Sequence, residues 1–210
     1  MNRYLPSLLA GIAAPLIYAA IVAYGAALTP GYTHVANAIS ELTQPGAPGK
    51  ELLDPLFAFY NVLILIFALG LHGAFRQRGI DLARGCSVAI AATGLAGLLM
   101  WAFPQDPVGS PATATGIGHI VLASVESLGS LLAIFLMAMS LRRHPAWRGF
   151  VLYCYATLAV VAVSGVAAAL AAATRSNFMG LVERVTIGFF LLWVLATGLT
   201  LLLGGGRKPA

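Results

Sequence analysis

The residues best suited to chemistry in this sequence are His119 and Glu126, which lie within one long apolar run. Seven residues are close to two turns of an α-helix, so both side chains share one face of the helix that this run predicts. A charged group at membrane depth costs roughly 2.5–3.5 kcal/mol on insertion scales, which makes Glu126 a candidate functional residue. We interpret the face carrying His119, Ala123, Glu126 and Ser130 as a polar stripe directed into a helix bundle.

Further polar side chains are predicted to gather at the same end of the bundle as His119. They come from at least five predicted elements, whereas the opposite half of the bundle has few comparable residues. This concentration on one side is the main functional signal of the sequence. Its members are His34, Asn37, Ser40, Glu41, Asp54, Asn61, Asp106, His119, Glu126, Glu183 and Arg184.

Three kinds of chemistry fit this set. A histidine paired with a carboxylate can act as a general base and its orienting partner. Two histidines with an acidic residue can hold a divalent metal such as zinc, for which His34, His119 and Asp106 are the candidate ligands. Carboxylates in a polar site can also carry protons during transport. The sequence has neither an HExxH motif nor a dense histidine cluster, so the cofactor stays unknown.

The leading hypothesis is a membrane-embedded hydrolase or transferase that acts on a lipid in the outer leaflet. His119 would be the acid or base, Glu126 its orienting partner or a second acid, and Asp106 and Glu41 orienting residues or metal ligands. Arg184 would anchor a phosphate. The other predicted substrate-binding residues are Glu183, Asn61 and Ser40.

Two alternative functions remain open, so the sequence does not decide whether the protein is an enzyme. The first is a non-catalytic lipid-binding or scaffold protein, in which the polar residues tie the helices together. The second is a small proton-coupled transporter, which would need a polar path beyond Ser130. The sequence there reads LLAIFLMAM, and this apolar stretch favours a closed pocket over a channel.

The elements that must position these residues are membrane-spanning helices. The chain is 60% hydrophobic and only 9% charged, with a mean hydropathy of +0.89, whereas soluble domains are about 25% charged. We therefore predict an all-α integral membrane protein, in which one domain of residues 1–210 forms a six-helix bundle. Six runs approach or exceed the length that spans a bilayer, at about 5–28, 55–75, 85–103, 117–141, 149–173 and 180–203.

The basic residues predict the orientation of the bundle. With both termini in the cytoplasm, nine of the twelve lysines and arginines lie on the inner side and three on the outer side. The net charge of +5 is thus explained by topology, and nucleic acid is not an expected partner. We expect membrane lipids as partners and the inner (cell) membrane as the location, while the oligomeric state stays open.

The longest connection covers residues 29–51 on the predicted outer side. Thr33 can cap a short helix over about 33–43, which Gln44-Pro45-Gly46 would end. In such a helix His34 and Glu41 would lie on one line.

Several short motifs occur in an order that resembles the bacterial and archaeal domain-of-unknown-function family 998. They are ISEL (Ile39–Leu42), FPQD (Phe103–Asp106), the downstream His119, and GLVER (Gly180–Arg184) followed by Trp193. The resemblance implies a six-helix fold but brings no reaction with it. It also implies that Ser40, Glu41, Asp106, His119, Glu183 and Arg184 fill motif positions. More distantly, the ISE loop and the FP end of the third helix resemble DRAM-like and GPI-anchor-remodelling membrane proteins.

Overall fold

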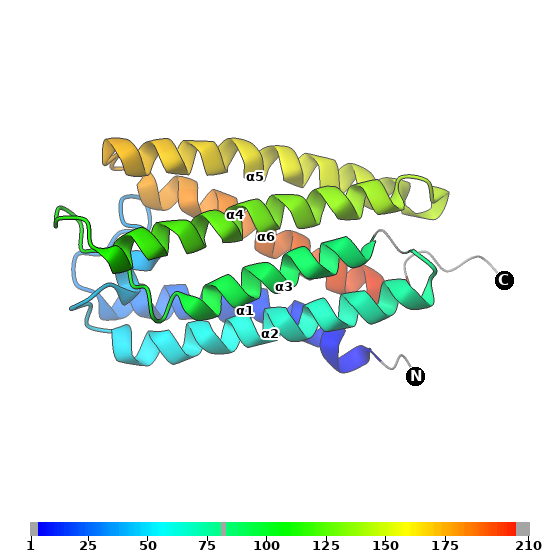
Figure 1. The fold of residues 1–210 in the computed structure, drawn as a ribbon, viewed down its shortest axis with the longest axis horizontal. Coiled ribbons are helices and arrows are strands. Elements are labelled where there is room, and N and C mark those ends of the chain that lie inside the picture. The colour runs from blue at the N-terminus through cyan, green and yellow to red at the C-terminus, as the bar shows by residue number, and fades with distance from the viewer. Residues whose placement is uncertain (1–3, 81–82, 205–210) are drawn as a thin grey trace.

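The computed structural model describes residues 4–80 and 83–204, and within these ranges all regular structure is helical. Six α-helices alternate in direction along the long axis of the molecule (Figure 1). They are α1 (Leu5–Leu28), α2 (Lys50–Gln77), α3 (Ala83–Leu99), α4 (Ala114–Leu141), α5 (Arg148–Thr174) and α6 (Met179–Leu202). Two short 3₁₀-helices, η1 (Ile39–Thr43) and η2 (Pro145–Trp147), lie in the connections.

Five of the helices are long and apolar enough to cross a membrane, and α3 is a shorter apolar helix of 17 residues. The predicted all-α bundle with six helices is therefore confirmed. Because the bilayer offers no water to backbone groups, helices that satisfy their own hydrogen bonds are the expected way to span it.

The six helices form a closed ring. Each packs mainly against its neighbours in sequence, and α6 packs against α1 to close the circle. The closure is tight, since a Cβ atom added to Gly198 of α6 would lie 3.2 Å from the backbone oxygen of Leu8 in α1. Small residues allow such close approach where lipid supplies no hydrophobic drive. The side chains of Leu8, Phe67 and Trp193 are fully buried in the resulting core.

The two ends of the bundle differ in character. We call the end that holds η1 the η1 end, and the end where α1 begins and α6 ends the basal end (Figure 1). That the basal end faces the cytoplasm stays a prediction, and the described chain places six arginines there. They are Arg76, Arg78, Arg84, Arg142, Arg143 and Arg148.

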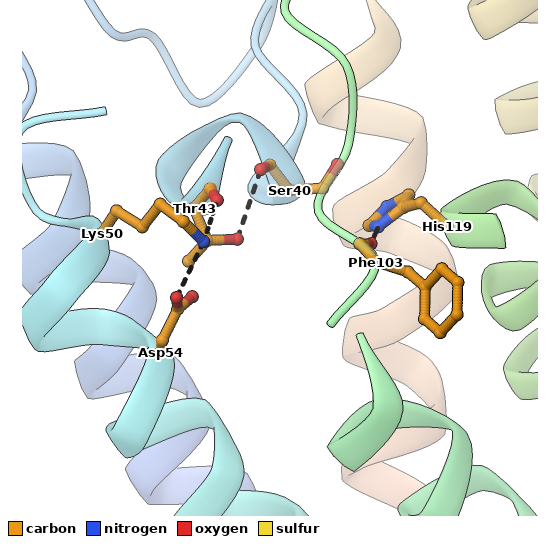
Figure 2. A network of polar contacts seen from close by, with 6 residues as sticks. All are labelled: Ser40, Thr43, Lys50, Asp54, Phe103 and His119. Atoms are coloured by element: carbon orange, nitrogen blue, oxygen red, sulfur yellow. Dashed lines mark hydrogen bonds and ion pairs between the residues drawn. The ribbon is translucent and has the colours of Figure 1, made fainter. Parts of the chain in front are cut away.

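Helix α2 begins at Lys50, five residues before the predicted start at residue 55. Pro55 lies inside the helix, where its missing N–H removes one backbone hydrogen bond. Lys50 offsets this loss, since its Nζ atom lies 2.7 Å from Oδ2 of Asp54 and donates to the Thr43 carbonyl oxygen at 3.0 Å (Figure 2). These bonds also join the first turn of α2 to η1.

Two other predicted boundaries are wrong. Helix α3 ends at Leu99 and not at 103, because Pro104 disfavours helical geometry in the residue before it. The predicted loop helix over 33–43 is reduced to η1, and residues 34–37 form a turn and a bend. Here the Asn37 Oδ1 atom accepts from the Thr33 N–H at 2.9 Å, so a side chain takes a backbone donor.

Candidate functional site

Arg184, in the second turn of α6, holds the connection between α1 and α2. Its Nη1 atom donates to the carbonyl oxygens of His34 (2.9 Å), Asn37 (3.0 Å) and Gly180 (2.9 Å), and Nη2 donates to the Tyr32 hydroxyl. The guanidinium also lies over the Tyr32 ring, 5.5 Å from its centroid. We call this set of contacts the Arg184 clamp. Its predicted role as a phosphate anchor stays a prediction, and the clamp already engages both terminal nitrogens.

The Tyr32 phenol extends the clamp to the start of η1. Burial raises the pKa of Tyr32, and the nearby Arg184 charge opposes this shift without cancelling it. The phenol is therefore protonated at neutral pH, and it donates to the Ala38 carbonyl oxygen at 2.9 Å. The Tyr32 hydroxyl thus accepts a hydrogen bond from Arg184 and donates one to the Ala38 carbonyl oxygen in the loop.

Glu183 serves the same loop as its neighbour Arg184. Its Oε2 atom accepts from the Ile39 N–H at 2.6 Å, and the Leu181 N–H donates to the Val35 carbonyl oxygen at 2.9 Å. Neighbouring helix residues face different directions, which predicts different partners for Glu183 and Arg184. They do bind different groups, but both groups belong to the 32–39 segment.

Glu41 and Ser40 are also engaged within the loops. Glu41 accepts from the Ala38 N–H and from Asn37 Nδ2, both at 2.8 Å, so both of its oxygens have partners. The Ser40 hydroxyl donates to the side-chain oxygen of Gln105. Ser40 therefore joins η1 to the segment between α3 and α4.

Asp106 and His119 organise the start of α4. The carboxylate of Asp106 accepts from the Thr113 hydroxyl (2.6 Å) and the Thr113 N–H (2.8 Å), and these bonds lower the pKa of Asp106. His119 Nδ1 lies 3.0 Å from the carbonyl oxygen of Phe103, as Figure 2 shows. A carbonyl can only accept, so Nδ1 carries the proton, and Nε2 of the neutral ring is free to act as a base.

Glu126 occupies a different position from the other acidic residues. It lies twelve residues into α4, about 18 Å along the helix from Ala114. It lies deep among protein atoms, yet its side chain keeps part of its surface accessible. Within residues 4–80 and 83–204 its carboxyl group has no hydrogen-bond or ion-pair partner.

Two tyrosines lie within electrostatic range of Glu126. Glu126 interacts electrostatically with Tyr60 of α2 and with Glu183 of α6, and Tyr18 of α1 interacts with both carboxyl groups. The Tyr18 and Tyr60 rings meet edge to face, with centroids 4.8 Å apart. Each tyrosine lies ten residues from the η1 end of its helix, about 15 Å along the axis. Both therefore lie near the depth of Glu126, and we call Glu126, Glu183, Tyr18 and Tyr60 the central cluster.

The structure brings only some of the predicted site residues together. His119 is about 10 Å along α4 from Glu126 and bonds to Phe103, so no His119–Glu126 hydrogen bond forms. Asn61 is buried between α2 and α3, bonded to the Phe57 carbonyl oxygen at 3.0 Å and packed against Gly97. No group of three His, Cys, Asp or Glu side chains suited to a metal ion occurs in the described part of the chain. The predicted set of His34, His119 and Asp106 is thus not assembled.

The sequence reasoning missed Tyr18 and Tyr60. A usable signal was present, since both are phenols in the middle of apolar helices and lie away from the membrane interface where tyrosine is enriched. Buried phenols need a hydrogen-bond partner for the hydroxyl, which makes such positions informative.

Together, the number, length and apolar composition of the helices define a polytopic helical membrane protein. The chain belongs to the family described as Protein of unknown function (DUF998), whose model matches residues 12–200. The predicted family resemblance is thereby confirmed, and the more distant similarity to DRAM-like proteins stays a prediction. Comparisons with curated proteins and with solved structures find no match to this chain.

Proposed function

We propose that this protein binds the polar head of an amphiphile inside its helix ring, with Glu126 as the principal polar contact. The observation that carries the proposal is the free carboxyl group of Glu126 at membrane depth. An unpaired acidic group at membrane depth costs free energy, so its retention in an otherwise apolar helix favours a ligand that completes its hydrogen bonds.

The central cluster supports a ligand head that donates hydrogen bonds or carries positive charge. Two carboxyl groups and two phenols make up this cluster, and Glu183 uses only Oε2 on the loop. The nearest cation, Arg184, already binds three carbonyl oxygens and one hydroxyl of the clamp. A primary amine on an alkyl chain matches both the acidic cluster and its apolar surroundings.

The η1 end supports a fixed binding site, because the loop there is anchored by contacts from α2 and α6. The loop over this end is tied down at Arg184, Glu183 and Lys50, and Ser40 joins it to the α3–α4 connection. The apolar sequence beyond Ser130 supports a closed site, which favours binding over passage through the bundle.

Binding of dodecylamine and of dodecanol to the detergent-purified protein tests the proposal. We expect the wild type to bind the amine more tightly than the alcohol. The Glu126→Gln variant should lose this preference, with a rise in Kd for the amine of roughly 10- to 100-fold. This range corresponds to the loss of a hydrogen bond to a charged group, about 1.5–3 kcal/mol. Isothermal titration calorimetry measures both constants.

Glu51→Gln is the matched control for this experiment. Glu51 is exposed in the first turn of α2 at the same end, so the variant removes the same charge outside the ring. If both variants lost amine binding equally, the effect would come from the general loss of negative charge and not from Glu126 itself. Unchanged binding in Glu126→Gln would overturn the proposal.

A second candidate function, lipid hydrolysis or transfer, is favoured by the oriented imidazole of His119. Its Nδ1–H bond to Phe103 leaves Nε2 as the acceptor, the tautomer that a general base needs. His119 lies five residues into α4, about 8 Å along the helix, and therefore nearer the headgroup level than Glu126. There Nε2 would take a proton from water or an alcohol as its oxygen attacks the ester carbonyl carbon, and would return the proton to the alcohol that leaves when the ester C–O bond breaks.

This second candidate predicts a change in membrane lipids when the protein is produced in cells. Mass spectrometry of extracted lipids should reveal a product in cells with the wild type that is absent with His119→Ala. His144→Ala, at an exposed position on the basal side, is the matched control. Identical lipid profiles with wild type and His119→Ala would exclude the catalytic role.

A further inference from the structure

A groove on the outer surface of the ring, between α2 and α3, lies apart from the central cluster. Its volume is about 340 Å³, and its wall is mainly apolar with two polar side chains. The lining residues are Leu65, Ala68, Leu69, His72, Ser87, Val88 and Ala91. This surface faces the space that lipid chains occupy around a membrane-spanning helix.

Both walls of the groove end in an arginine at the basal end. On α2, Arg76 follows His72 by four residues and Leu69 by seven, so all three lie on one helix face. On α3, Arg84 precedes Ser87 by three residues and Ala91 by seven, which places it on the face that lines the groove. Arg76 is exposed and is the second-last residue of α2, and its side chain has no hydrogen bond or ion pair with a described residue.

The order of side chains along the groove matches the order of groups in a phospholipid. The arginines lie at the helix ends, where phosphates of the bilayer are found. His72 lies about 6 Å deeper than Arg76, and Ser87 about 5 Å deeper than Arg84, at the level of the ester groups. Beyond them the walls are apolar, with Leu65 and Leu69 facing Val88 and Ala91.

We propose that this groove is a binding site for one anionic phospholipid. The phosphate would contact Arg76 and Arg84, the ester region His72 and Ser87, and one acyl chain would lie along the apolar wall. Charge complementarity selects an anionic lipid, because residues 76–84 include Arg76, Arg78 and Arg84 against Asp81, a net charge of +2. Arginine forms paired hydrogen bonds to phosphate, which suits it to this contact.

Binding of fluorescent phosphatidylglycerol to the full-length protein in detergent, with unlabelled phosphatidylglycerol or phosphatidylcholine as competitor, tests this site. We expect phosphatidylglycerol to compete more strongly with the wild type. The double variant Arg76→Ala/Arg84→Ala should raise the Kd for phosphatidylglycerol about 30-fold, since each basic residue near anionic lipid adds roughly a factor of five. The single variant Arg76→Ala should raise it about fivefold.

The double variant Arg142→Ala/Arg143→Ala is the matched control, because it removes the same charge from exposed positions at the same end. A loss of binding equal to that of Arg76→Ala/Arg84→Ala would overturn the site in favour of general attraction to the basal end. Equal competition by phosphatidylcholine would likewise overturn the preference for an anionic lipid.

Filling the groove tests the position of the acyl chain. Ala91→Phe should weaken binding of both lipids, whereas Val163→Phe, on an exposed face of α5, should not. If Ala91→Phe lowers the yield of folded protein, Val88→Phe replaces it, because Val88 is 67% exposed and lines the same groove. Unchanged lipid binding in the folded groove variant would overturn the proposal.

Discussion

Replacing Arg184 by alanine is expected to release the α1–α2 connection from α6 and to destabilise the protein by about 3–5 kcal/mol. Hydrogen bonds to charged groups contribute about 1.5–3 kcal/mol each, and one guanidinium serves two loop carbonyls and the Tyr32 hydroxyl. These acceptors lose their partner together when Arg184 is truncated. The measurement is the midpoint of thermal unfolding in detergent, with hydrogen exchange over residues 29–49 to locate the change.

Two further variants distinguish the loss of the clamp contacts from the loss of one positive charge. Arg184→Lys should recover only part of the stability, because an ammonium group cannot reproduce the planar fork that reaches Tyr32 and both carbonyl oxygens. Arg175→Ala, which removes an exposed arginine at the same end, should change the midpoint little. Unchanged hydrogen exchange over the loop in Arg184→Ala would contradict the clamp.

Gly180→Ala is expected to be as harmful as loss of the arginine itself. A Cβ atom at position 180 would lie 2.3 Å from the Asn37 carbonyl oxygen and 2.8 Å from both the His34 carbonyl oxygen and Arg184 Nη1. Two of these neighbours are backbone atoms, which cannot turn aside as a flexible side chain can. Overpacking of this kind costs about 1–3 kcal/mol, and here it also displaces the loop from the clamp.

The matched control for Gly180→Ala is Gly188→Ala, two turns further along the same helix. A Cβ atom there meets nothing within 4 Å, so alanine should be neutral or stabilising by up to about 1 kcal/mol. Thermal unfolding of both variants decides the comparison. Equal midpoints would show that residue 180 does not need a bare backbone for the loop to dock.

The helices could be predicted from the sequence because each depends on local composition. An apolar run of bilayer length forms a helix whatever its neighbours are. Near Pro55 and Pro104 the helix boundaries depend on contacts with other segments, which the local composition does not reveal. The Lys50–Asp54 and Lys50–Thr43 bonds extend α2 toward its N-terminus, and no partner extends α3 beyond Leu99.

The candidate site could be predicted only in part. Glu126 could be singled out because an acidic residue in an apolar helix is rare, and the structure places it within α4. The contacts of Arg184 and Glu183 could not be predicted, because both side chains bind backbone groups. A backbone carbonyl or N–H has no sequence signature. The same limit applies to His119, whose partner is the carbonyl oxygen of Phe103.

The ring closure has a consequence for biogenesis. Helices that pack mainly against their sequence neighbours give a low contact order, so α1 to α5 can associate in the order in which they are synthesised. The α1–α2 connection is the exception, because its partners Gly180, Glu183 and Arg184 lie on the last helix. The 32–39 segment of this connection is made early but gains these contacts only when α6 is inserted, whereas η1 can already bond to Lys50 and Gln105. The η1 end is therefore fully docked only when the chain is complete. A protein truncated before α6 would have a loop that lacks its contacts with the last helix.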